Sequence, residues 1–192
     1  MSAEPLLSVL IGIGLSAACG FRVFVPLLVM SVASLSGHLT LSPGFEWIGT
    51  YPALLAFTVA TVAEITGYYI PWLDHLLDLI AAPAAVIAGI VAMASSISGM
   101  SPFMRWSLAL IAGGGIAATF HGITGLARVT STATTGGLAN PIVSTIEAAG
   151  ASVLSILAIA IPLAGVAALA ALLSLVWWFI RARKRRHEES LS

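Results

Sequence analysis

An apolar stretch near the N-terminus, residues 6–35, reads LLSVLIGIGLSAACGFRVFVPLLVMSVASL and contains a single charged side chain, Arg22. A helix needs about 20 apolar residues to cross a hydrocarbon core of roughly 30 Å. The stretch is therefore long enough to enter a membrane, and its one charge falls near its middle. It predicts a membrane-embedded helix that must accommodate an arginine.

The rest of the chain has a similar composition. Its 192 residues are 59% hydrophobic and 8% charged, whereas soluble domains are roughly a quarter charged. Further spans are expected near 53–70, 73–99, 106–128 and 141–180. They should be helical, because open β-structure cannot satisfy its backbone in lipid. We therefore predict an all-α, polytopic membrane protein with broken or kinked helices, and a soluble enzyme is excluded.

The segment 141–180 allows two arrangements. As one helix it would be about 60 Å long, which is too long for a single span. It contains Pro162 at its midpoint but no polar turn. It is therefore either a hairpin of two spans or a half-buried helix before Gly150 followed by a long, proline-kinked span.

The C-terminal tail, residues 181–192, indicates the orientation of the chain. Its five basic residues are Arg181, Arg183, Lys184, Arg185 and Arg186. By the positive-inside rule, they place the C-terminus in the cytoplasm, where they can attract anionic lipid headgroups. The formal net charge of the chain is zero, and no nucleic-acid partner is expected. The side of the membrane on which the N-terminus lies stays open.

Two halves of the chain show a weak internal repeat. A ladder of small residues, a Glu-x-x-Gly helix and a proline-containing helix follow one another twice. The first set comprises Gly12, Ser16, Gly20, Glu64 and Pro83, and the second comprises Gly114, Ala118, Gly122, Glu147 and Pro162. A duplication would favour an inverted pair with a site on its pseudo-two-fold axis. The ladders alternatively serve close helix packing, including packing between copies in a homo-oligomer.

Three charged residues fall deep within the expected spans: Arg22, Glu64 and Glu147. An arginine at a helix centre costs about 2.5–3.5 kcal/mol on insertion scales, so it should face a partner or water. Gly20 and Pro26 bracket Arg22, and a helix break there would free backbone groups to bind an anion together with the arginine. Either glutamate could neutralise Arg22 or take up a proton. The three sum to minus one when ionised.

The other charged residues of the spans can reach an interface: Glu4, Glu46, Asp74, Asp78, Arg105 and Arg128. Asp74 and Asp78 are four apart on one helical face, with His75 beside them. They could bind a divalent cation, although two ligands do not make a metal site and the remaining oxygens would have to come from elsewhere. The alternative is a solvated first helical turn, in which aspartate is favoured by the helix dipole.

Two further features could line a pathway. His121 lies inside a predicted span, either on the route or hydrogen-bonded to a neighbouring helix. Residues 130–140 form an uncharged connection rich in hydroxyls and glycine, in which Thr134, Thr135 and Asn140 could coordinate an ion. Asn140 is expected to cap the next helix, with Pro141 at its first position. No P-loop, nucleophilic triad or cysteine cluster is present, so no cofactor is expected.

Three separated motifs resemble a catalogued family. They are GFRVFVPL at 20–27, PWLDHLLD at 71–78 with APA at 82–84, and STATTGGLANP at 131–141. Together they resemble the uncharacterised bacterial membrane family known as domain of unknown function 4126, over essentially the whole chain before the tail. The resemblance implies an integral membrane protein and little more, and we expect the chain to lie in the bacterial inner membrane. It assigns no activity to any residue.

The function suggested by these residues is a small transporter or channel for a small polar solute or ion. Arg22 would bind an anionic group, Glu64 or Glu147 would supply a counter-charge or proton site, and 130–140 would line the route. One alternative is a non-catalytic scaffold or assembly factor, whose small-residue faces dock partner helices. Another is a membrane-embedded enzyme acting on lipid headgroups through a metal at Asp74, His75 and Asp78.

Overall fold

A computed structural model describes residues 3–189 and their side chains, except those of 3, 71–76, 78, 176, 179, 180 and 182–189. This part of the chain is helical and contains no strand, which confirms the all-α prediction. The elements are α1 (Ala3–Phe21), α2 (Phe24–Leu35), the 3-10 helix η1 (Glu46–Gly49), α3 (Tyr51–Gly67), α4 (Pro71–Ser96), α5 (Pro102–Leu108), the π-helical turn η2 (Ala109–Gly113), α6 (Gly114–Thr135), α7 (Asn140–Ala160) and α8 (Pro162–Glu189).

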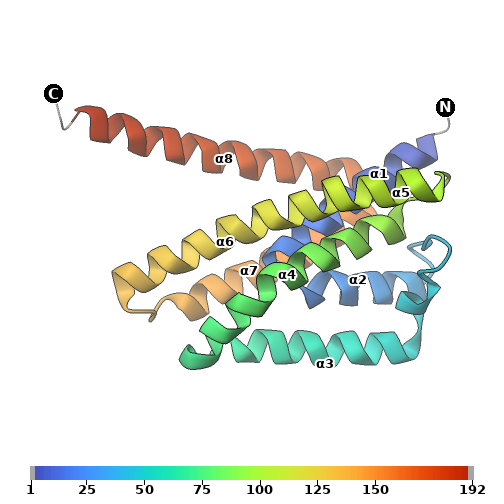
Figure 1. Ribbon diagram of the computed structural model, residues 1–192, viewed down its shortest axis with the longest axis horizontal. Coiled ribbons are helices and arrows are strands. Elements are labelled where there is room, and N and C mark those ends of the chain that lie inside the picture. The colour runs from blue at the N-terminus through green and yellow to red at the C-terminus, as the bar shows by residue number, and fades with distance from the viewer. Residues whose placement is uncertain (1–2, 190–192) are drawn as a thin grey trace.

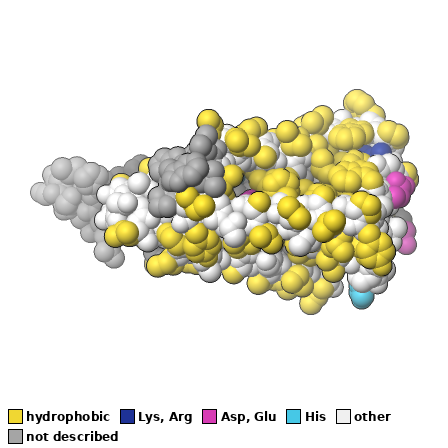
Figure 2. Space-filling model, turned by 90° about the horizontal axis from the view of Figure 1, so that it is seen from below, with side chains coloured by type: hydrophobic (Ala, Val, Ile, Leu, Met, Phe, Trp, Pro, Cys, Tyr) yellow, Lys and Arg dark blue, Asp and Glu magenta, His cyan; other side chains and the backbone are white. Residues whose placement is uncertain are grey.

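Four helical segments among the described residues are long and apolar enough to cross a membrane: Glu4–Phe21, Leu79–Ser96, Pro102–Thr135 and Asn140–Ala160. They lie side by side along the long axis of the molecule (Figure 1). Hydrophobic side chains cover much of the face seen in Figure 2, and the described charged side chains on this face are concentrated at one end. The fold is that of a multi-pass helical membrane protein.

The first apolar stretch is broken at Arg22 and Val23 and folds back on itself. Ser98 N donates to Ser8 Oγ at 3.3 Å near the start of α1, and Ser42 N donates to Ser95 O at 2.8 Å just after α2. Both the start of α1 and the end of α2 therefore lie beside the end of α4. The two helices form a hairpin whose tip lies inside the bundle (Figure 1). The prediction of broken helices is confirmed.

The segment 141–180 forms two helices that meet at Ile161, and the second runs back toward the start of the first (Figure 1). Pro162 has no N–H and cannot continue the ladder of α7, which explains the position of the break. The segment is thus a helical hairpin, and whether both of its helices cross the membrane stays a prediction. The far end of α8 rises away from the other helices.

Close packing of the helices depends on small residues. A Cβ added at Gly14 would lie 2.6 Å from Ala158 Cβ of α7, and one at Gly89 would lie 2.8 Å from Gly113 O. Small residues thus bring α1, α4, α6 and α7 together within a single chain. Homo-oligomerisation through small-residue faces and an internal duplication both stay predictions.

Candidate functional site

Four charged side chains meet near the tip of the α1–α2 hairpin: Arg22, Glu64, Arg128 and Glu147. Arg22 directly follows α1, and Glu64 is three residues from the end of α3. Glu147 is seven residues into α7, which is about 10 Å along the helix. The cluster therefore lies in the half of the bundle that carries the α6–α7 turn.

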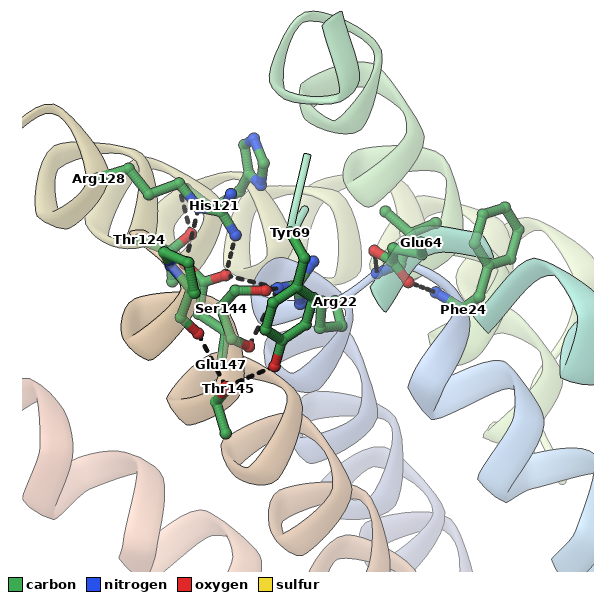
Figure 3. A network of polar contacts seen from close by, with 12 residues as sticks. Arg22, Phe24, Glu64, Tyr69, His121, Thr124, Arg128, Ser144, Thr145 and Glu147 are labelled. Atoms are coloured by element: carbon green, nitrogen blue, oxygen red, sulfur yellow. Dashed lines mark hydrogen bonds and ion pairs between the residues drawn. The ribbon is translucent and has the colours of Figure 1, made fainter. Parts of the chain in front are cut away.

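Glu147 accepts from two arginines at once. Its Oε2 is 3.3 Å from Arg22 Nη2 and also pairs with Arg128 Nη2, while Arg128 Nε donates to Oε1 at 3.1 Å (Figure 3). All three residues are at least nine-tenths buried. In a low-dielectric interior such a network is stable only if each charge is compensated.

The expectation that Arg128 reaches an interface is wrong, because α6 does not end there. The helix continues to Thr135, through residues that the sequence assigned to a connection. Their hydroxyls bond to carbonyls of the preceding turn, as in Thr130 Oγ1 to Leu126 O at 2.8 Å. Gly136, at φ +64°, terminates the helix. Arg128 is consequently two turns inside, and only 6% exposed.

Two residues that sequence reasoning missed complete the arginine network. Ser144 accepts from Arg22 Nη2 through its carbonyl, at 3.0 Å, and through its hydroxyl. Both arginines lie over the Tyr68 ring, with Arg22 Cζ at 4.1 Å and Arg128 Cζ at 3.9 Å from the ring centroid. Cation–π contacts of this kind strengthen when they are desolvated. Tyr68 therefore helps to hold two like charges in one place.

Among the described residues, the Glu64 carboxylate is bound by backbone N–H groups and not by an arginine. Val23 N donates to its Oε1 at 2.9 Å and Phe24 N donates to its Oε2 at 3.1 Å (Figure 3). These are the N–H groups that the break leaves without helical partners at the start of α2. The backbone at the break does bind an anion, as the sequence suggested, but this anion is the Glu64 carboxylate. Arg22 instead pairs with Ser144 and Glu147.

The four charges cancel. Two arginines and two glutamates sum to zero when all are ionised, so the excess negative charge expected from Arg22, Glu64 and Glu147 alone disappears once Arg128 is included. A charged molecule that entered the site would change the net charge of these four described residues.

A cavity of about 270 Å³ adjoins the cluster. Glu64 and Arg128 contribute to its wall, together with Tyr68, His121 and Thr124. Its lining also includes Gly122 and Val129 of α6, which are exposed, so the cavity opens at the surface of the bundle. A polar solute could therefore approach the charged residues from outside the described core.

Comparison with known proteins identifies a family. The model of the family described as Domain of unknown function (DUF4126) matches residues 9–182. The chain belongs to this family. No curated protein and no solved structure matches the DUF4126 chain.

The remaining candidate residues of this DUF4126 protein are more scattered. His121 lines the cavity, whereas Thr134 and Thr135 bond to carbonyls of their own helix at the end of α6. Asn140 does not cap α7 as predicted. Its side chain instead donates to Thr132 Oγ1 of α6 at 3.2 Å, and Ala139 occupies the cap position.

The proposed metal ligands Asp74, His75 and Asp78 have side chains outside the described part of the structure. Among the side chains that are described, no group of three or more His, Cys, Asp or Glu could hold a metal ion. The headgroup-enzyme alternative therefore stays a prediction, with no described residue to support it.

Proposed function

We propose that this protein is a small transporter or channel that moves a small polar solute or ion through the cavity beside Glu64 and Arg128. The observation that carries the proposal is a helix break buried inside the bundle, next to a charged cavity. Interrupted helices whose free backbone groups face a site inside the membrane are typical of transporters. Irregular backbone at membrane depth is tolerated where it is buried or lines a cavity.

The interior of the bundle between this cavity and the opposite end is filled by apolar side chains among the described residues. Leu15 of α1, Met30 of α2 and Met93 of α4 are fully buried in this core. A solute that reaches the cavity therefore cannot continue without movement of these helices. This supports a transporter with alternating access more than an open pore. The basic tail would place the cavity nearer the cytoplasmic side.

Filling the cavity should block transport. Gly122 lines it, and a Cβ added there meets no heavy atom within 4 Å, so Gly122→Leu can begin a side chain beside the cavity without a clash at Cβ. We expect solute flux into liposomes to fall at least about tenfold. Gly115→Leu is the matched control, because Gly115 is also an open glycine of α6 but does not line this cavity. Its flux should equal that of the wild type.

A static scaffold is the second candidate, and the neutral, mutually paired network favours it. It predicts no flux of any small solute and the same partner binding in both glycine variants. Equal flux in the Gly122→Leu and Gly115→Leu variants, with both correctly folded, would mean that the cavity is not the route.

A further inference from the structure

Glu64 occupies the start of α2 as a bound anion would. Each carboxylate oxygen accepts from one backbone N–H, of Val23 and of Phe24. The N-terminus of a helix favours negative charge through its free N–H groups and its dipole. The residue is 8% exposed and lines the cavity, so the same donors lie beside a space that a solute can enter.

The groups left without partners around this position are also donors. Arg22 is 1% exposed, and its Nε and Nη1 have no hydrogen-bond partner. Arg22 interacts electrostatically with Glu64 as well as with Glu147. A buried donor without a partner is costly, since it loses its hydration and gains nothing in return. If the Glu64 carboxylate left, the N–H groups of Val23 and Phe24 would become free donors, and the buried Arg22, which directly precedes them but does not itself line the cavity, would contribute its positive charge.

We propose that the solute is a small monovalent anion that replaces the Glu64 carboxylate at the start of α2 and enters together with one proton, which Glu64 takes up. This rests on the proposed transport function and defines its substrate class. Charge balance requires the proton. An anion added to the four described charged side chains, which sum to zero, would give them a net charge of minus one, whereas protonation of Glu64 restores zero.

Glu64 is the carboxylate best suited to accept the proton. Glu147 is held by both Arg22 and Arg128, whereas no salt bridge reaches Glu64 among the described side chains. The other titratable groups on the cavity wall are Cys19 of α1, Tyr68 and, from α6, His121 and Arg128. The side chains at the start of α4, including Asp74 and Asp78, lie outside the described set. Protonation of Glu64 removes one acceptor from the α2 N-terminus and leaves the arginine pairs intact.

The cavity limits the size and charge of the anion. Its volume of about 270 Å³ would hold a halide, nitrate or a short monocarboxylate with a few waters, given that a water molecule occupies about 30 Å³. A divalent anion would need a second compensating proton, for which the cluster offers no other unpaired carboxylate among the described residues.

The test is anion binding to the purified full-length chain, measured calorimetrically with sodium chloride and sodium nitrate in sulfate buffer at constant sodium, between pH 5 and pH 8. Above the pH at which Glu64 loses its proton, Kd should rise about tenfold per pH unit, because one proton accompanies each anion. Glu64→Gln, a neutral mimic, should bind tightly at all pH values. Glu4→Gln, at an exposed glutamate, should behave like the wild type.

Proton uptake by the wild type gives a second readout that needs no variant. Adding chloride to the protein in weak buffer should consume about one proton per anion bound. Absence of anion binding in wild type and Glu64→Gln, or binding without proton uptake, would overturn the proposal. Flux of a cation or neutral solute would leave the transport function standing and remove this substrate class. Proton-linked anion binding with no flux would support the anion site and contradict the proposed transport function.

Discussion

Glu147→Ala should lower the free energy of unfolding by about 3–5 kcal/mol, because it removes the carboxylate with which two buried arginines pair. Arg22 and Arg128 both pair with Glu147 and are 1% and 6% exposed. Ser144 and Tyr68 would remain in contact with them, but neither carries a compensating charge. The loss should appear as a lower midpoint in equilibrium unfolding by SDS in mixed micelles.

Two companion variants separate charge from packing. Ile146 neighbours Glu147 on α7 but is 66% exposed, so Ile146→Ala should change stability by less than about 1 kcal/mol. Adding Arg128→Met to Glu147→Ala removes one of the two buried positive charges that paired with Glu147 and should recover part of the loss. If Glu147→Ala is no worse than Ile146→Ala, the arginines are hydrated or find other partners, and the buried-network description is wrong.

The features set by local sequence were predictable. Composition and apolar length indicate the membrane helices, and Gly20 and Pro26 indicate the break at Arg22. The interruption before Pro162 follows equally from the missing proline N–H. Each of these depends on residues within one or two helical turns, which is why the fold class could be predicted without knowledge of the packing.

The pairing of charges was not predictable in the same way. Arg22 meets Ser144, 122 positions away, and Val23 meets Glu64, 41 positions away. Such contacts depend on how the helices cross, which the pattern of each helix does not specify. The wrong expectation that Arg128 reaches an interface could have been avoided from local sequence, since the glycines at 136 and 137 are the stronger signal for the end of the helix. Its partner Glu147 still required the fold.

The helix break at Arg22 shows both what local sequence can predict and what depends on helix packing. Residues around Arg22 predicted that freed N–H groups would bind an anion. They could not reveal that α3 supplies that anion as Glu64, which sits over the N-terminus of α2. The local expectation about chemistry was sound, and the identity of the ligand depended on a helix that packs there.

Gly20→Ala should also be strongly destabilising, by about 1–3 kcal/mol, because α1 and α6 touch at this position with no room for a methyl group. An added Cβ would lie 2.5 Å from Phe120 Cβ and 2.6 Å from Ala117 O. The second of these is a backbone atom, so relief requires α1 and α6 to separate.

Separation of α1 and α6 would also displace residues of the charged cluster and its cavity. Gly20 is two residues before Arg22, and Phe120 directly precedes His121, which lines the cavity. Gly20→Ala should therefore weaken anion binding as well as stability in the same calorimetric and SDS assays. Gly115→Ala is the control: nothing lies within 4 Å of its Cβ, and replacing a helical glycine by alanine should stabilise α6 by about 0.5–1 kcal/mol. Opposite signs for these two glycine substitutions are the expected result. Equal effects would mean that α1 and α6 are not in close contact at Gly20, and that the position of Arg22 does not depend on their packing.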